Sequence, residues 1–236
     1  EAIRKRYRAE KFLIYFQAYT NTFGRFRELE YFYKEALKEK DVVGIVVGTR
    51  PDCLPKRVLQ KFSEIAQENY LSVELGVQTF DDAQLQFLSR GHDSASSLKA
   101  IRKLKTLPDI NLCVHLMFGL PDETDAQIRK TAEILSEQKV DGVKLHNLHV
   151  LRNTPLEKLY RESRFKPVDL EEYSRKVALF LENLSPKIAV HRLAAVASRW
   201  DELVAPQWTR EKMKTTQFID DFLAAKETWQ GRCFEV

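Results

Sequence analysis

The chain has 236 residues, 44% of them hydrophobic and 31% charged, which is typical of a globular protein long enough to bury a core. Its 38 basic residues against 34 acidic ones leave a net charge of +4, too small to require a nucleic-acid partner, although it allows one. The sequence holds no apolar run of about 18 residues, so we expect no membrane partner.

Apolar, strand-like runs alternate with helical patterns along the chain. Segment 1–11 is basic and typical of the end of a helix. The expected strands are Phe12–Ala18, Val42–Val47, Leu71–Val77, Leu112–Phe118, Val143–Leu148 and, in addition, Ile188–Arg192. Helical patterns follow at Glu28–Lys40, Lys56–Asn69 and Ala126–Lys139. Repeats of about 30–40 residues with this alternation predict an α/β fold with a parallel sheet, either a barrel or doubly wound.

Polar side chains recur on one face of four of these strands. In a barrel, alternate strand residues face the helices and the interior. The polar residues expected to face the interior are Gln17, Glu74, Gln78, His115, Lys144 and His146. Because burying such groups without partners is expensive, we expect water or a polar ligand inside, or else a polar layer that satisfies itself. Most lie late in their strands, where parallel α/β proteins place their sites.

The three cysteines, Cys53, Cys113 and Cys233, are far apart and form no CxxC or CxxxCxxC motif. A sparse, odd number of cysteines favours the reducing cytoplasm. We expect each of them to be a small apolar filler or a free thiol, and none to be a metal ligand.

Short motifs follow the strands in order. They are Tyr15–Thr22, Gly48–Pro55, Glu74–Thr79 with Arg90-Gly91-His92, His115–Pro121, Asp141–His146, Val190–Leu193 and Ala205–Trp208. Together, in this order and spacing, they resemble the radical S-adenosylmethionine (SAM) superfamily. The resemblance spans nearly the whole chain and is strongest to the bacterial YhcC-type subfamily, which is related to the radical SAM domain of the Elongator catalytic subunit.

This resemblance implies a partial TIM-like (β/α)6 barrel over residues 1–199, with a helical extension over 200–236 packed on it. It also implies a [4Fe–4S] cluster held by three cysteines, which we expect with a first strand upstream of Glu1. SAM bound to that cluster is cleaved to a 5′-deoxyadenosyl radical, which takes a hydrogen atom from a substrate, here RNA or a small metabolite. A reductant protein would be a partner, and the chain alone is expected to be inactive.

The resemblance further implies roles for individual residues. Residues 18–22 would meet the SAM amino group, Gln78 would reach SAM, and Arg90 would bind its carboxylate. The full set of expected SAM-binding residues is Gln17, Tyr19, Thr20, Asn21, Arg50, Glu74, Gln78, Arg90, His115, Gly119 and Pro121. The expected substrate cavity holds Lys144, His146 and His191.

Two departures from the family pattern change the expected ribose contacts. Relatives often carry glutamate where this chain has Gly48, and some carry aspartate where it has His115. Ribose recognition is therefore different here, or falls to Arg50 or Glu74.

Two other functions remain open at this point. A barrel metallohydrolase would use His115, His146, His149 and His191, but His146 and His149 should point to opposite faces and no aspartate ligand accompanies them. A non-enzymatic RNA-binding module would use the basic clusters 4–11 and 210–214 and some of the 14 Phe, 8 Tyr and 3 Trp. Most of these aromatics lie at spacings typical of a core.

Overall fold

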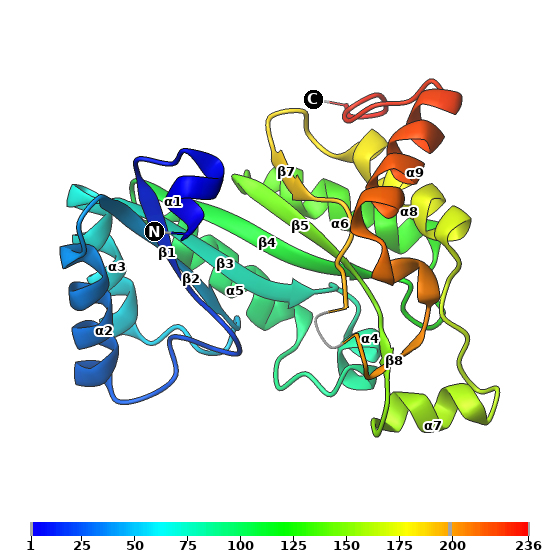
Figure 1. Ribbon diagram of the computed structural model, residues 1–236, viewed down its shortest axis with the longest axis horizontal. Coiled ribbons are helices and arrows are strands. Elements are labelled where there is room, and N and C mark those ends of the chain that lie inside the picture. Colours follow the sequence, from blue (N-terminus) through cyan, green and yellow to red (C-terminus); the bar gives the residue numbers. More distant parts are fainter. Residues whose placement is uncertain (1, 198–199, 236) are drawn as a thin grey trace. The chain divides into compact units, whose positions relative to one another are not determined.

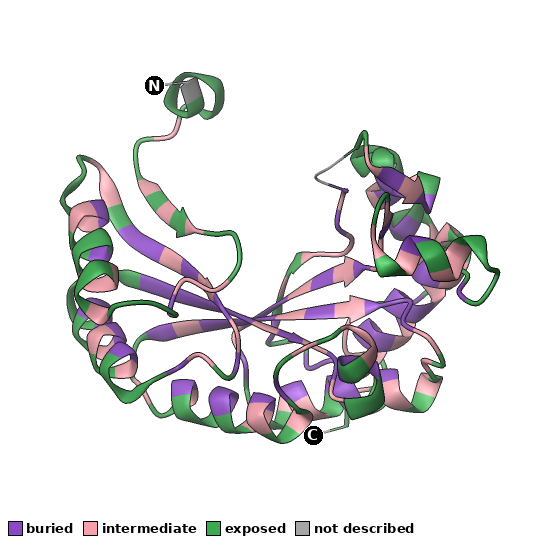
Figure 2. Ribbon diagram, turned by 90° about the horizontal axis from the view of Figure 1, so that it is seen from below, coloured by how far each residue is buried: buried purple, intermediate pink, exposed green. Residues whose placement is uncertain are grey.

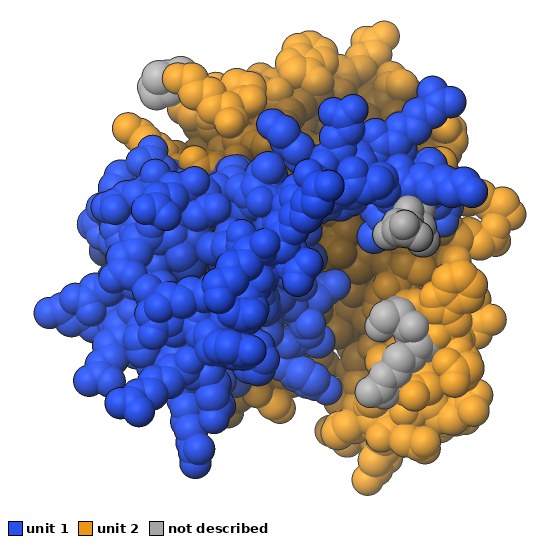
Figure 3. Space-filling view, turned by 60° about the vertical axis from the view of Figure 1, so that its left-hand side comes forward, with its two compact units in different colours: residues 1–77, 91–114 blue, residues 78–90, 115–236 orange. Residues whose placement is uncertain are grey.

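The computed structural model describes residues 2–197 and 200–235, whose strands and helices alternate along the chain (Figure 1). The chain divides into two compact units, which Figure 3 colours separately. Unit 1 comprises residues 1–77 and 91–114, and unit 2 comprises residues 78–90 and 115–236.

Six strands of the described residues form one sheet in the order β1-β2-β3-β4-β5-β7, and two form a separate pair. Their bounds are β1 Phe12–Phe16, β2 Val42–Thr49, β3 Tyr70–Gln78, β4 Ile110–Phe118, β5 Gly142–Asn147, β6 Val150–Leu151, β7 Ala189–Arg192 and β8 Leu203–Ala205. All six expected strands are present, and their ends differ from the predicted ones by two residues at most.

Apart from α1, which precedes β1, the helices come after strands of the fold. Their bounds are α1 Ala2–Tyr7, α2 Phe26–Lys38, α3 Lys56–Glu68, α4 Asp82–Phe87, α5 Ser94–Lys105, α6 Asp125–Glu137, α7 Pro155–Arg161, α8 Leu170–Asn183 and α9 Lys212–Ala225, with a short 3-10 helix, η1, at Gln207–Arg210. Among the described residues, no helix has both the length and the apolar character needed to cross a membrane.

In unit 1, β1 pairs with β2 and β2 with β3, both in parallel. Tyr33 of α2 and Phe62 of α3 are fully buried with their rings 6.1 Å apart, and Phe16 of β1 meets Tyr33 edge-on. At Gly44 of β2 a side chain would collide with the Tyr70 carbonyl at 2.0 Å, so only glycine permits this close pairing with β3. The apolar residues facing the helices therefore form the core, as the alternation predicts.

In unit 2, β5 pairs in parallel with β7, and α8 packs against both α6 and α9. Phe118 at the end of β4 meets Phe180 of α8, with ring centroids 5.3 Å apart. On β4 the residues facing the helices are buried, whereas His115 and Met117 on the other face are half-buried. Figure 2 colours the chain by burial, with buried residues along the strands and on one face of the helices.

A short antiparallel pair, β6 with β8, was not expected from the sequence. It covers a small apolar cluster of Val150, Phe165 and Ala205. Segment 200–236 was expected to be helical and irregular; it contains η1 and α9, but also β8. The predicted boundary after residue 199 falls where residues 198–199 lie outside the described residues, so it stays a prediction.

Candidate functional site

The loop after β1 is tied to the end of β2. The side-chain nitrogen of Asn21 donates to the carbonyls of Phe16, Ala18 and Gly48 at 3.0, 3.2 and 3.2 Å, and its backbone N–H donates to Gly48 O at 3.0 Å. Tyr33 Oη donates to the Asn21 carbonyl. The side-chain amide of Asn21 thus stabilises the conformation of the loop that we expect to bind SAM.

The other expected SAM-binding residues of this loop differ in exposure. Gln17 is exposed, and the Tyr19 side chain is 97% exposed. The Thr20 hydroxyl lies beside the Cys53 thiol, whose pKa is raised chiefly by burial. The loop therefore presents the Tyr19 ring and the Gln17 amide to the outside and keeps the Thr20 hydroxyl oxygen buried.

The loop after β2 is closed by an ion pair. Arg50 donates to both carboxylate oxygens of Asp52, at 2.9 and 2.6 Å. Burial alone would raise the pKa of Asp52, but the hydrogen bonds from Arg50 and its own backbone, with the charges of Arg50 and His92, lower it. Gly91 makes room for the guanidinium, since a Cβ there would come within 2.5 Å of Arg50 Nη2. Gly91 thus lies against this pair, and the next residue, His92, places Nδ1 3.8 Å from Asp52 Oδ1.

Glu74 lies on β3 with only 5% of its surface exposed, and its carboxylate accepts a hydrogen bond from Tyr15 Oη on β1. The hydroxyls of Thr22 and Thr49 share a hydrogen bond, and Thr22 also donates to the Cys53 carbonyl. Most polar side chains at the strand ends of unit 1 are thus engaged with one another.

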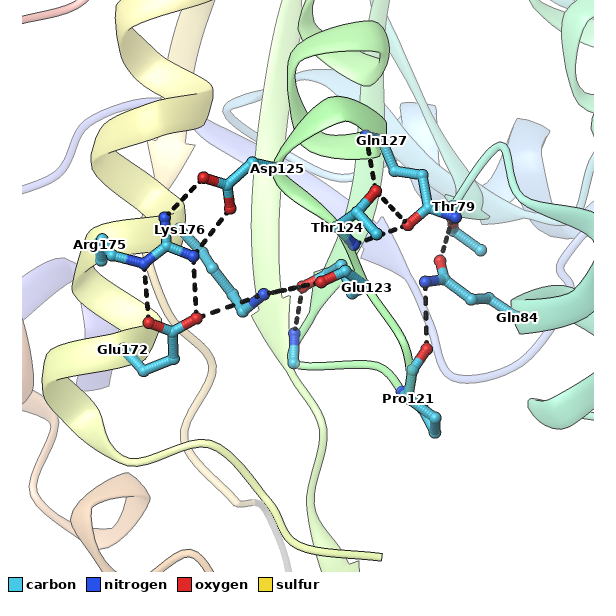
Figure 4. Close-up of polar contacts among 11 residues, drawn as sticks. Thr79, Gln84, Pro121, Glu123, Thr124, Asp125, Gln127, Glu172, Arg175 and Lys176 are labelled. Carbon is cyan, nitrogen blue, oxygen red and sulfur yellow. Dashed lines mark hydrogen bonds and ion pairs between the residues drawn. The ribbon is translucent and has the colours of Figure 1, made fainter.

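In unit 2 a chain of hydrogen bonds links the segment after Gln78 to the loop after β4 (Figure 4). Thr79 Oγ1 donates to the buried Gln84 Oε1 at 2.7 Å, and Gln84 Nε2 reaches the Pro121 carbonyl at 3.4 Å. Gln127 Nε2 donates to Asp81 at 2.7 Å, while its Oε1 accepts from Thr124 N as part of a capping box. The two segments expected to meet SAM are therefore held together.

A buried ion pair closes the same loop from the other side. Lys176 Nζ of α8 lies 3.2 Å from Glu123 Oε2, and the two side chains are 6% and 5% exposed. The same Oε2 accepts from the Gly119 backbone N–H at 3.0 Å, and Lys176 also donates to the Glu123 carbonyl at 3.3 Å. Burial raises the pKa of Glu123 against the opposing effects of Gly119 and Lys176. Lys176 thus holds Glu123, and the Glu123 carboxylate in turn bonds to Gly119 at the other end of the turn.

Arg175, the neighbour of Lys176 on α8, makes ion pairs that are exposed to solvent. Arg175 bonds both Glu172 and Asp125, with Nη2–Oδ1 of Asp125 at 2.8 Å, and these side chains are roughly two-fifths exposed (Figure 4). The hydrogen bonds that Arg175 donates to Glu172 and Asp125 raise the pKa of Arg175. The exposed ion pairs of Arg175 can therefore be compared with the buried pair of Lys176 and Glu123.

Basic side chains gather on the inner face of β4, β5 and β7. Lys144 of β5 and Arg192 of β7 are register partners. The Arg192 guanidinium contacts His146 Nε2, and that nitrogen lies 3.2 Å from His115 Nδ1. Burial first, and then the charges of Arg192, His115, His149 and Lys144, lower the pKa of His146 to about 2. This imidazole is therefore neutral at every physiological pH.

Three further residues named in the sequence analysis, His191, Arg90 and His149, lie in different segments of the chain. His191 is exposed, and its ring covers Gly142, where a Cβ would come within 2.7 Å of Nε2. Arg90 follows α4, and its backbone N–H donates to Leu85 O at 2.9 Å. His149 contacts the Asn147 amide at 2.7 Å. Among residues 2–197 and 200–235, no three His, Cys, Asp or Glu side chains converge on a position that could hold a metal ion.

Several residues of this region were given no individual role in the sequence analysis. They are Thr79, Gln84, Glu123, Gln127, Lys176 and Arg192. Two of them, Gln127 and Lys176, could have been predicted from sequence patterns. Thr124 with Gln127 three residues later is a capping-box pattern. Lys176 lies on the face of α8 that carries the buried Tyr173 and Phe180, and a lysine on an apolar face predicts a buried acidic partner.

Comparisons with known proteins match the sequence of this chain to a protein family. The sequence profile of the radical SAM superfamily matches residues 1–135, and that of the radical SAM C-terminal domain matches residues 140–225. Protein YhcC of Escherichia coli is 36% identical over 92% of this chain and 70% of its own length. The uncharacterized protein YtqA of Bacillus subtilis is 31% identical over 99% of this chain and 72% of its own length.

A more distant relative is described by an activity. The tRNA uridine(34) acetyltransferase of Methanocaldococcus jannaschii is 28% identical over 63% of this chain, which corresponds to 27% of that protein.

Among solved structures, the archaeal Elp3 of Methanocaldococcus infernus matches 97% of this chain with a TM-score of 0.82 and 18% identity. This chain spans 58% of the length of that Elp3 chain. The Streptococcus suis SuiB structure bound to SAM matches with a TM-score of 0.55 and 15% identity. These likenesses establish the fold: the predicted partial TIM-like (β/α)6 barrel of the radical SAM type is confirmed.

Proposed function

This chain belongs to the radical SAM superfamily, and from that premise we propose that it is the barrel of an enzyme that cleaves SAM reductively and uses the 5′-deoxyadenosyl radical on a substrate. The observation that carries the proposal is the placement of the family-like motifs. They follow β1, β2, β3 and β4 in the order in which the family carries them, each at or just after the carboxyl end of its strand.

The residues of unit 2 suit SAM in their chemistry. SAM offers a carboxylate, an amino group, ribose hydroxyls and an adenine ring. The amide of Gln78 can both donate and accept, and the guanidinium of Arg90 can bind a carboxylate with two parallel bonds. The turn from Gly119 to Pro121 would lie beside the adenine, and its shape is held by Glu123, which accepts from the Gly119 N–H, and by Gln84, which reaches the Pro121 carbonyl. We propose that these three groups bind SAM.

Unit 1 would contribute through its strand-end loops. There we propose Gln17, Tyr19, Thr20 and Asn21, with Arg50 and Glu74 for the ribose. Asn21 and Arg50 act at least partly by shaping their loops, because their side chains already bond to carbonyls and to Asp52. His115 of unit 2 completes the proposed set.

The iron–sulfur cluster would supply the electron that splits SAM, and the residues that would hold it are proposed to lie in a three-cysteine loop upstream of Glu1. A reductant protein would be the partner, and the cytoplasm the location, as the sparse cysteines favour. The chain's own residues would orient SAM and keep water from the radical. The substrate stays open between RNA and a small metabolite. The comparisons lend no support to a metallohydrolase or to a non-enzymatic RNA-binding module.

The test is anaerobic reconstitution of the full-length gene product with iron and sulfide, followed by addition of SAM and dithionite. We expect 5′-deoxyadenosine only when the reductant is present, and none from residues 1–236 alone. An upstream region without clustered cysteines, or no 5′-deoxyadenosine from a protein that has incorporated iron, would refute the proposal.

A further inference from the structure

The short helix α4 lies between two of the residues proposed to bind SAM. Gln78 ends β3 just before this helix, and Arg90 follows it. The backbone N–H of Arg90 donates to Leu85 O at 2.9 Å, so Arg90 is tied to α4 itself. A shift of α4 would therefore move both groups relative to the Gly119–Pro121 turn, which is proposed to lie beside the adenine.

Asp81 fixes the start of α4 with both of its carboxylate oxygens. Oδ1 accepts from the backbone N–H of Gln84 at 2.9 Å and caps the helix. Oδ2 accepts from Gln127 Nε2 of α6 at 2.7 Å. The Oε1 atom of Gln127 accepts from the backbone N–H of Thr124 at 2.7 Å, at the N-cap of α6. Gln127 thus connects the start of α4 to the end of the loop that follows β4.

Gln84 makes a second connection between the same two segments. Only 5% of this residue is exposed. Its Oε1 atom accepts from Thr79 Oγ1 at 2.7 Å, and its Nε2 donates to the Pro121 carbonyl at 3.4 Å (Figure 4). The Thr79 hydroxyl in turn accepts from the Asp81 N–H at 3.1 Å. Because both ends of this buried amide bond within the protein, Gln84 is suited to hold the turn and not to contact a ligand.

Little free space separates the two segments. The cavity between them has a volume of about 10 Å³, enough for about one water molecule. Thr79 and Gln84 line it from one segment, and Glu123 and Gln127 line it from the other. A closely packed interior transmits a displacement instead of absorbing it. The two connections therefore set one spacing between the segment 78–90 and the turn 119–124.

A ligand that contacts both segments gains affinity from a fixed spacing. SAM joins a methionine part to an adenosine part, and we have proposed the first for residues 78–90 and the second for the Gly119–Pro121 turn. When two binding segments are held apart at the right distance, the second part of a joined ligand binds at a high effective concentration. When the spacing varies, this gain is lost although each segment keeps its own contacts.

We propose that Gln84 and Gln127 are positioning residues that set the spacing between the methionine side and the adenosine side of the SAM site. The inference rests on the proposed function, because it names the side chains that make this site fit SAM as a whole. Neither glutamine belongs to the set of residues proposed above to contact SAM.

The test compares SAM with its two halves, methionine and 5′-methylthioadenosine, in the reconstituted full-length protein. Affinities come from calorimetric titration, with the halves in competition against SAM. Gln84→Leu combined with Gln127→Leu should weaken SAM binding by about tenfold, the effect of about one net hydrogen bond. The affinities of both halves should stay within about twofold of the wild type. Gln86→Leu changes an exposed glutamine of α4 and is the matched control, with all three affinities unchanged.

An equal loss of affinity for SAM and for either half would overturn the proposal, because the glutamines would then act on a local contact or on folding. SAM binding within about twofold of the wild type in the double variant would overturn it as well. So would a tenfold loss in the Gln86→Leu control. If the double variant does not fold, Gln127→Leu, at a half-buried position, decides by the same comparison of SAM with its halves.

The inference and the proposed function can fail separately. If the double variant loses SAM affinity as expected and the wild type forms no 5′-deoxyadenosine, the positioning role stands and the radical chemistry does not. If the wild type forms 5′-deoxyadenosine and the double variant binds SAM normally, the activity stands and this inference does not. A wild-type protein that binds no SAM would overturn both.

Discussion

The loops after β2 and after β4 are each closed by an acid–base pair, but the two pairs lie in different surroundings. In unit 1 the side chains of Arg50 and Asp52 are 37% and 30% exposed. In unit 2 those of Lys176 and Glu123 are 6% and 5% exposed, and both also bond to the backbone of the turn. Water can replace a partner in the first pair and not in the second. The buried pair therefore controls the shape of its loop far more strongly.

Removal of Lys176 should produce the largest effect. Lys176→Met leaves the Glu123 carboxylate buried with only the Gly119 N–H as a hydrogen-bond donor among its bonds described above. Breaking such a pair costs about 3–5 kcal/mol of unfolding free energy, which urea denaturation measures. The loss should shrink at acidic pH, because burial already raises the pKa of Glu123 and a protonated carboxyl tolerates the site.

Two further variants sharpen this result. Arg175→Met removes the exposed neighbour on the same helix and should cost no more than about 1 kcal/mol. Lys176→Met combined with Glu123→Gln removes both charges and keeps an acceptor for Gly119, so much of the loss should be recovered. Equal losses for Lys176→Met and Arg175→Met would show that burial does not distinguish the two pairs.

The second effect comes from His146 of unit 2. Its pKa is about 2 in the folded protein against about 6.5 when unfolded, so below pH 6.5 only the unfolded state takes up this proton. Stability therefore falls as the pH falls, by about 1.4 kcal/mol per pH unit, or roughly 2 kcal/mol at about pH 5. The neighbours Arg192, Lys144, His115 and His149 all oppose protonation.

Unfolding free energies at about pH 7.5 and about pH 5 should show this effect. His146→Gln should lose less stability on acidification than the wild type, by roughly 2 kcal/mol. His191→Gln, which removes an exposed histidine, should leave the wild-type difference in place. A His146→Gln protein as acid-sensitive as the wild type would mean that the imidazole is not buried among cations.

The smallest effect concerns the half-exposed pair of unit 1. The folded pKa of Asp52 lies below its unfolded value, so its stabilisation is present above about pH 4 and is lost as the pH falls through the folded pKa. Asp52→Asn should cost no more than about 1 kcal/mol at neutral pH, and less at about pH 3. If Asp52→Asn lost as much unfolding free energy as Lys176→Met, the two ion pairs would not differ in their contribution to stability.

Much of this architecture could be predicted because local pattern and fold agree. Six apolar runs became the six strands of the sheet, since their alternation matches the two-residue period of a strand. The polar residues at their interior faces were identified in the same way, and His115 and His146 do meet. The order of the motifs was enough to identify the family.

The features that could not be predicted from the sequence depend on contacts between segments that are far apart in the chain. β6 and β8 have two and three residues, too short for a periodic signal, and they form because Val150, Phe165 and Ala205 bury one another. Lys176 meets Glu123 across 53 positions, which no local rule connects. The register that places Arg192 beside Lys144 is likewise set by pairing in the sheet.

The central claim is that the strand-end groups of this fold bind SAM, and calorimetric titration of SAM into the reconstituted full-length protein tests it most directly. A charge-assisted hydrogen bond to SAM is worth roughly 1.5–3 kcal/mol, so Arg90→Lys and Gln78→Ala should each weaken SAM binding by about ten- to a hundredfold. Folding should persist, because neither change opens a large apolar cavity. Arg57→Lys, at an exposed position of α3, is the matched control. Affinities of Arg90→Lys and Gln78→Ala within about twofold of the wild type would contradict the account.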